Sequence, residues 1–239
     1  MIIGGLEKLS ILDYPDHLAA IIFTQGCNFR CHFCYNPMLV LPHKGEDEKN
    51  IKEKGFSELS TKNLFLFLRE RFGRLDGVVI TGGEPTLHPD LPEFIKKIKK
   101  IGYDVKLDTN GTNPDMLNQL IKEKLIDYIA MDVKYPAEDY PIMTGIPDVI
   151  HKIKKSIKII MNSGVDYEFR TTYVKGIHTF RSAKYIGQLI HGANLYYVQN
   201  FRDGKTITKG FDSSNSFTDK ELKRIKREAG LYVKKTIIR

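Results

Sequence analysis

Cysteine is scarce in this chain, and long hydrophobic runs are absent from it. The 239 residues include three cysteines, which all lie within one stretch of eight residues. This clustering excludes a disulfide framework, and the odd number argues against an exported, oxidised protein. The sequence also lacks the roughly 18 consecutive apolar residues of a membrane-spanning helix, and it shows no signal-peptide pattern. We therefore expect a cytoplasmic protein with no membrane association.

Acidic residues are fewer than basic ones, and the formal net charge is +8. Much of the excess lies in residues 96–100, in residues 152–158 and in the last twenty residues. The first two runs alternate with isoleucines at helical spacing, which favours solvent-exposed helix faces. An acidic partner or a polyanionic substrate is the alternative. Because no appended nucleic-acid-binding domain is evident, we do not expect nucleic acid as a partner.

Short apolar segments alternate with amphipathic ones along the chain. The predicted strands are residues 18–24, 77–81, 104–108, 127–132, 167–174 and 194–200. The segments between them carry apolar stripes at helical spacing, and Thr61 and the Asn113-Pro114 pair are typical of helix starts. This alternation predicts an α/β fold with a parallel sheet covered by helices. Residues 44–58, rich in lysine and glutamate, are expected to form an exposed loop.

Distinctive motifs follow the first four predicted strands. In order they are the cysteine segment 27–34, Gly82-Gly83-Glu84-Pro85, Asp108-Thr109-Asn110-Gly111 and Asp132-Val133-Lys134. Ligands of parallel α/β folds bind at the carboxyl ends of the strands. We therefore expect one active face that collects these motifs.

Cys27, Cys31 and Cys34 have the spacing C-x3-C-x2-C. Structural zinc takes four ligands, so a zinc site would also need His32 or His43. Electron-transfer clusters of four irons use four cysteines, and this chain has no fourth. Three thiolates suit a [4Fe–4S] cluster with one iron left open for another ligand. The missing fourth cysteine therefore favours a catalytic cluster over an electron carrier.

This cysteine motif, with Phe33 just before its last cysteine, resembles the signature of the radical S-adenosylmethionine (SAM) superfamily. The resemblance implies a [4Fe–4S] cluster on Cys27, Cys31 and Cys34, and a SAM molecule bound to the open iron. It also implies reductive cleavage of SAM to a 5′-deoxyadenosyl radical, which removes hydrogen from a substrate. The implied fold is a partial (β/α)6 barrel of the TIM-like type.

The other motifs agree with this resemblance, although alone they indicate two tight turns and a surface ion pair. By analogy with the family, Gly83 and Glu84 would hold the amino group of SAM, and Lys134 would contact SAM. A monovalent cation site would be formed by Asp108, Thr109 and Asp132. The complete set of expected cofactor contacts is Phe33, Tyr35, Gly83, Glu84, Asp108, Asp132, Lys134 and Arg170.

Arg170 lies in a strand predicted to line the interior, where a buried arginine needs an anionic partner. The carboxylate of SAM is one candidate. Glu168 is the other candidate, unless strand alternation places both residues on one face with solvent, so the sequence leaves the partner of Arg170 open. His178 is expected in a loop or on a helix surface, without a chemical role.

Residues 5–16 and 23–31 resemble the anaerobic ribonucleoside-triphosphate reductase activating proteins, which are relatives of pyruvate formate-lyase activating enzyme. The resemblance implies hydrogen abstraction from a glycine of a partner glycyl radical enzyme, with a flavodoxin or ferredoxin-type electron donor. The predicted single domain covers residues 1–239, with its core at about 5–201 and a C-terminal helix and strand at 218–237. Alternatives are a radical SAM reaction on a small molecule, such as 7-carboxy-7-deazaguanine synthesis, or on tRNA.

Overall fold

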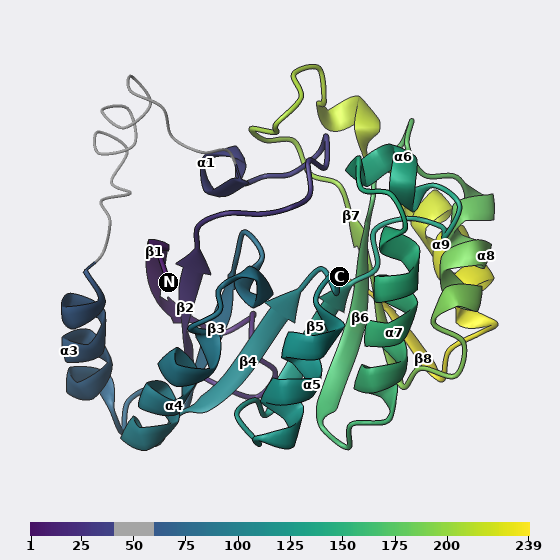
Figure 1. Ribbon diagram of the computed structural model, residues 1–239. Helices are drawn as coiled ribbons and strands as arrows, with labels where there is room; N and C mark the ends of the chain where they lie inside the picture. Colours follow the sequence, from purple (N-terminus) through teal and green to yellow (C-terminus); the bar gives the residue numbers. More distant parts are fainter. Residues whose placement is uncertain (41–59) are drawn as a thin grey trace. The chain divides into compact units, whose positions relative to one another are not determined.

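The computed structural model describes residues 1–40 and 60–239 and divides the chain into two compact units. We call them the N-terminal unit (Met1–Asn28, Met38–Thr109 and Asp115–Ile129) and the C-terminal unit (Phe29–Pro37, Asn110–Pro114 and Ala130–Arg239). Figure 1 labels their helices and strands. The loop expected at residues 44–58 lies outside the described residues. That the chain is a single domain stays a prediction.

The N-terminal unit holds four strands in sequence order: β1 (Ile3–Ser10), β2 (Ala19–Thr24), β3 (Gly77–Gly82) and β4 (Asp104–Thr109). β1 runs antiparallel to β2, and the other pairings are parallel. β5 (Tyr128–Asp132) begins beside β4, because the N–H of Asp127 donates to the carbonyl of Val105 at 2.8 Å. The helices are α1 (Pro37–Val40), α3 (Thr61–Arg71), the 3₁₀ helix η1 (Pro85–Leu87), α4 (Leu91–Ile101) and α5 (Pro114–Lys122).

Local sequence explains these elements. Val78, Val79 and Ile80 of β3 are fully buried, as expected for a parallel strand covered on both faces. α4 buries its apolar stripe and ends at Gly102, whose φ of 112° lies in the left-handed region that favours glycine. α3 is capped by Ser60, whose hydroxyl accepts from the N–H of Asn63 at 3.2 Å. The predicted cap, Thr61, was therefore wrong by one residue.

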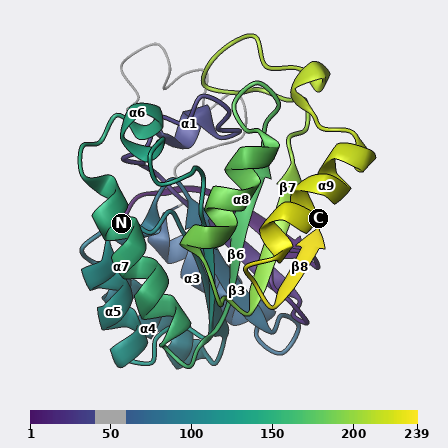
Figure 2. The same cartoon turned by 90° about the vertical axis from the view of Figure 1, so that its right-hand side faces the viewer.

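The C-terminal unit completes β5 and adds three parallel strands in sequence order: β6 (Asp166–Tyr173), β7 (Leu195–Asn200) and β8 (Lys235–Ile238). Just after β5, the N–H of Val133 donates to the carbonyl of Arg170 on β6 at 2.8 Å. The helices are α6 (Tyr140–Thr144), α7 (Val149–Met161), α8 (Phe180–Leu189), the 3₁₀ helix η2 (Ser213–Asn215) and α9 (Asp219–Gly230). Figure 2 shows α7, α8 and α9 on one side of this unit.

Most elements match the expectation from sequence. The six predicted strands correspond to β2–β7, and the C-terminal helix and strand predicted at 218–237 are α9 and β8. β1 was missed, since its sequence contains two glycines and its second half is mostly exposed. The parallel α/β class is confirmed. No helix in the described part of the chain is long and apolar enough to cross a membrane.

Candidate functional site

In the N-terminal unit, the turn after β3 pairs by its backbone with the residues that precede Cys27. The N–H of Gly83 donates to the carbonyl of Thr24, and the N–H of Glu84 donates to the carbonyl of Gly26, both at 2.8 Å. A Cβ atom on Gly83 would lie 2.0 Å from the carbonyl oxygen of Gly26. Position 83 therefore requires glycine, because any side chain would displace the start of the cysteine loop.

Glu84 is fully buried, and its carboxylate is held in place by threonines. Its Oε1 accepts from the N–H of Thr86 at 3.1 Å, from the hydroxyl of Thr86 at 2.5 Å and from the hydroxyl of Thr109 at 2.7 Å. These hydrogen bonds fix the carboxylate in one orientation. Thr109, expected to bind a cation, is thus a support for Glu84.

Asp108 forms an ion pair that the sequence reasoning missed. The ammonium of Lys106, which has no exposed surface, lies 2.6 Å from Oδ1 of Asp108. Residues two apart on a strand share a face, so the pair could have been recognised in the sequence. The monovalent cation site on Asp108, Thr109 and Asp132 stays a prediction of the resemblance.

In the C-terminal unit, Asp132 lies between two cationic side chains. Its carboxylate accepts from Nε of Arg170 at 2.9 Å and from Nζ of Lys134 at 3.1 Å. Burial opposes ionisation of Asp132, but Arg170 and Lys134 hold its pKa below the usual range. Burial would lower the pKa of Lys134, yet the charges of Asp132 and Cys31 raise it. Lys134 is therefore a permanent cation close to a cysteine.

The backbone of Lys134 is held at both its polar groups. Its N–H donates to the hydroxyl of Tyr140 at 2.9 Å, and its carbonyl accepts from Nε2 of His178 at 2.8 Å. Nδ1 of His178 accepts from the N–H of Val174 at 3.0 Å, which fixes a neutral imidazole. Burial lowers the pKa of His178 to about 4. His178 lies in the loop between β6 and α8, which is one of its two expected positions, but it is buried there and orients Lys134.

Glu168, which the sequence left open as a partner of Arg170, lies close to it. Nη1 of Arg170 lies 3.8 Å from Oε1 of Glu168, and Nη1 of Arg239 lies 3.6 Å from the same oxygen. Alternation does place Glu168 and Arg170 on one face of β6, but that face is interior, and Glu168 has no exposed surface. A buried carboxylate needs such cations to remain charged.

Cys31 and Cys34 lie on a loop anchored by the segment after β7. The N–H groups of Ile207 and Thr208 donate to the carbonyls of Cys34 and His32, at 3.2 and 3.0 Å. Cys31 is buried, Cys34 is half-buried, and none of the chain's cysteines is in a disulfide. The loop is therefore well placed to hold reduced thiols.

Phe33 and Tyr35, on either side of Cys34, pack against other residues of the C-terminal unit. The ring of Phe33 contacts Tyr135 and His178 edge-on, with centroid distances of 6.1 and 6.0 Å. Tyr35 stacks on Phe201 at 5.5 Å, and its hydroxyl accepts from the N–H of Arg202 at 2.7 Å. Both residues thus support the loop, and their expected contacts with a cofactor stay predictions.

The surroundings of Cys31 suit an anionic metal-bound thiolate. Burial raises the pKa of the Cys31 thiol, and the charge of Lys134 opposes this rise. The hydroxyl of Tyr135 lies beside Cys31, is buried, and has no hydrogen-bond partner of good geometry among the described residues. Thiolates and sulfides of a cluster would accept this hydrogen bond, so the residues fit the group that the sequence implies.

The full ligand set is defined by the sequence. Within residues 1–40 and 60–239, no group of three or more histidine, cysteine, aspartate or glutamate side chains is assembled as a metal site. Cys27 belongs to the N-terminal unit, whereas Cys31 and Cys34 belong to the C-terminal unit. The assignment of all three as ligands therefore rests on their spacing and on thiolate chemistry.

Comparison with known proteins decides the family. The model of the radical SAM superfamily matches residues 21–179, about two thirds of the chain. The chain belongs to the radical SAM superfamily. Membership implies a [4Fe–4S] cluster and SAM as cofactors, and it identifies the protein as a radical SAM oxidoreductase.

This radical SAM enzyme is similar in sequence to relatives that carry three different names. It is 32% identical over 243 aligned residues to a Methanocaldococcus jannaschii protein provisionally named a glycyl-radical enzyme activating enzyme; the match covers all of this chain and 95% of the relative. It is 30% identical to pyruvate formate-lyase-activating enzyme of Clostridium pasteurianum, over 60% of this chain and 57% of the relative. It is 28% identical to 7-carboxy-7-deazaguanine synthase of Methanopyrus kandleri, over 66% of this chain and 68% of the relative.

The fold is shared with solved radical SAM enzymes. The structure of SuiB from Streptococcus suis bound to S-adenosylmethionine superposes with a TM-score of 0.64 and 15% identity, over 92% of this chain and 49% of that one. This likeness supports the expected α/β fold of the partial-barrel type. It carries no information on the substrate.

Proposed function

We propose that this radical SAM enzyme activates a glycyl radical enzyme by abstracting hydrogen from a glycine Cα, and that the partner is an anaerobic ribonucleotide reductase. The observation that carries the proposed activity is the similarity over the whole chain to a relative provisionally named a glycyl-radical enzyme activating enzyme. The choice of ribonucleotide reductase as partner rests on the resemblance of residues 5–16 and 23–31 alone. A flavodoxin or ferredoxin-type protein would supply the electron, in the cytoplasm.

Cys27, Cys31 and Cys34 would hold the [4Fe–4S] cluster. When bound, the cluster would supply the electron for reductive cleavage of SAM, the chemistry that hydrogen abstraction from the substrate glycine requires. The ammonium of Lys134 lowers the cost of gathering negative charge near Cys31. The Tyr135 hydroxyl beside Cys31 is available to donate to it.

The remaining residues would bind and orient SAM. Glu84, whose carboxylate is held by Thr86 and Thr109, would bind the ammonium group of SAM, and the backbone of Gly83, packed against Gly26, would contribute to the same contact. Lys134 and Arg170 would face the methionine carboxylate, with Asp132 keeping both side chains in position.

The test uses the full chain, purified without oxygen and reconstituted with iron and sulfide. Mixed with a reductant, SAM and the glycyl radical enzyme of the same organism, it should produce the doublet electron paramagnetic resonance signal of a glycyl radical. Cys34→Ser should lose both the cluster chromophore and the signal. SAM cleavage without any glycyl radical would retain the radical SAM chemistry and contradict the proposed partner.

A second candidate is a reaction on a purine-like small molecule. It is favoured by the similarity to 7-carboxy-7-deazaguanine synthase over about two thirds of both chains. The same reconstituted enzyme should then consume a soluble substrate of that class with no partner protein present. Formation of 5′-deoxyadenosine that depends on the small molecule alone would select this alternative.

A further inference from the structure

The outer helices of the C-terminal unit carry the whole excess of positive charge. α7, α8 and α9 contain eleven lysines and arginines against three carboxylates, a net charge of +8, so the rest of the chain sums to zero. All eleven cations are exposed, and the three helices lie on one side of this unit (Figure 2). We call this set the basic face: Lys152, Lys154, Lys155, Lys158, Arg181, Lys184, Lys220, Lys223, Arg224, Lys226 and Arg227.

Ten of these eleven charges, all but that of Lys155, have no ion pair within the described part of the chain. Arg181 donates to the Tyr185 hydroxyl, and Arg224 lies over the Phe180 ring. On α4, by contrast, Lys96 pairs with Glu93 and Lys99 with Asp127. Uncompensated like charges repel one another, so the basic face is suited to a negatively charged partner.

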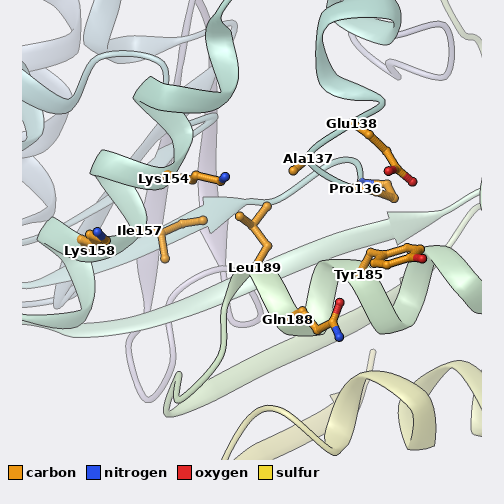
Figure 3. Close-up of a pocket in the computed structure, with 9 residues that line it drawn as sticks. All are labelled: Pro136, Ala137, Glu138, Lys154, Ile157, Lys158, Tyr185, Gln188 and Leu189. Atoms are coloured by element: carbon orange, nitrogen blue, oxygen red, sulfur yellow. The ribbon is translucent and has the colours of Figure 1, made fainter.

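Two grooves on the basic face combine cations with aliphatic side chains. Figure 3 shows the first, between α7 and α8, with a volume of about 390 Å³. Lys154 and Lys158 border it, and Ile157 and Leu189 contribute apolar surface. Glu138 is the one carboxylate among its lining residues.

The second groove lies between α9 and β8 and has a volume of about 480 Å³. Lys223, Lys226 and Arg227 border it together with Leu231 and Val233, and its lining contains no carboxylate. Leu231 is 73% exposed, so the apolar surface that it contributes to this groove is open to solvent.

The composition of the grooves distinguishes a protein partner from a nucleic acid. Surfaces that bind single-stranded nucleic acid present aromatic rings for base stacking. Tyr185 is the one aromatic residue lining either groove, and its hydroxyl is bound by Arg181. Grooves lined by aliphatic side chains and bordered by lysines are instead complementary to a protein surface that presents apolar side chains flanked by aspartate and glutamate.

We infer that the basic face is the docking surface for an acidic protein partner, whose apolar side chains enter the two grooves. The inference rests on the proposed function, in which the substrate is a glycyl radical enzyme, and it assigns that enzyme an acidic contact surface. The α7–α8 groove is also lined by Pro136, Ala137 and Glu138, which follow Lys134 directly in the chain. Docking would therefore contact the segment that carries Lys134.

The test compares two charge reversals in the full reconstituted enzyme. K154E/K158E changes the border of the α7–α8 groove, and K97E/K100E makes the same change of charge on α4, where neither lysine has an ion pair among the described residues. Affinity for the glycyl radical enzyme of the same organism is measured by biolayer interferometry at two salt concentrations. We expect K154E/K158E to weaken binding by roughly tenfold or more, and K97E/K100E by less than about twofold.

Further variants and measurements distinguish a wrong docking surface from a wrong partner. Leu231→Ser alters an exposed side chain, so it should weaken binding while leaving thermal stability unchanged. Uncoupled SAM cleavage should be the same in all variants, which shows an intact cofactor site. Equal losses in both charge reversals, or no loss in either, would overturn the docking surface. Tighter binding of a single-stranded RNA oligonucleotide, lost in K154E/K158E, would replace the protein partner by nucleic acid. Absence of any complex with the wild-type enzyme would overturn both the partner and its docking surface.

Discussion

Replacing Asp132 by asparagine should destabilise the cluster-free protein by about 2 kcal/mol. The substitution keeps the size of the side chain but removes the charge shared by Arg170 and Lys134, at 2.9 and 3.1 Å. Breaking a fully buried ion pair costs about 3–5 kcal/mol, because it leaves a buried charge without a partner. The side chains of Asp132, Arg170 and Lys134 are 30, 13 and 23% exposed, so solvent screening reduces this cost.

The assay is equilibrium unfolding by urea under anaerobic, reducing conditions, supported by thermal melts. For a chain of this length, about 2 kcal/mol corresponds to a fall in Tm of roughly 4–8 °C. Asp166→Asn is the matched control, since this exposed aspartate at the start of β6 has no ion pair in the described residues. It should change the free energy of unfolding by less than about 0.5 kcal/mol.

A double-mutant cycle separates the ion pair from other effects. Arg170→Gln alone should also destabilise, since it leaves Glu168 and Asp132 with less positive charge nearby. The double variant with Asp132→Asn should lose less stability than the two single losses added together, by about 1 kcal/mol or more. Strict additivity, or a stability of Asp132→Asn equal to that of Asp166→Asn, would refute the view that this carboxylate organises the two cations.

Three other substitutions test separate features. Gly83→Ala places a methyl group 2.0 Å from the carbonyl oxygen of Gly26, so it should cost about 1–3 kcal/mol in urea unfolding and lower the iron content after reconstitution. Tyr135→Phe removes only the hydroxyl beside Cys31; iron content should persist, while the cluster potential, measured by spectroelectrochemistry, should become more negative. The pKa of His178 is about 4 in the folded protein and near 6.5 in the unfolded chain, so the unfolded chain binds this proton at a higher pH. The free energy of unfolding should therefore fall as pH decreases from 7 to 4, by up to roughly 1.4 kcal/mol per unit, and His178→Gln should remove this contribution.

Local sequence was sufficient for the parts of the fold that repeat a simple pattern. β3 is a continuous run of buried aliphatic residues between glycines, so it is recognisable without its neighbours. β1 has no such signal, because its apolar residues are interrupted by Gly4, Gly5, Glu7 and Lys8. It becomes a strand by pairing antiparallel with β2, with two irregularities in register. Such a strand depends on a partner formed later in the chain.

In the candidate site, too, some residues were predictable from local sequence, and others depend on contacts between distant residues. The cysteine ligands and the glycine turn follow from spacing and residue type, since their chemistry is local to a few residues. His178 could not be assigned, because its burial and its bond to the carbonyl of Lys134 join residues 44 positions apart. Tyr135 was missed for a related reason: a tyrosine after a charged residue is unremarkable until the fold buries its hydroxyl beside Cys31.

The lysine–isoleucine helices α4 and α7 show most clearly what a sequence pattern does not predict, namely which lysines form ion pairs. Residues 95–101 and 153–159 have nearly the same alternation of lysine and isoleucine, and both were expected to be solvated faces. On α4 the fold brings Glu123 to Lys96, and Asp104 and Asp127 to Lys99, so that part of its charge is neutralised. On α7 no carboxylate is within ion-pair distance of Lys154 or Lys158 in the described residues. Whether the lysines of such a helix are paired or unpaired thus depends on which acidic residues tertiary packing brings near them, and the helical repeat in the sequence does not contain this information.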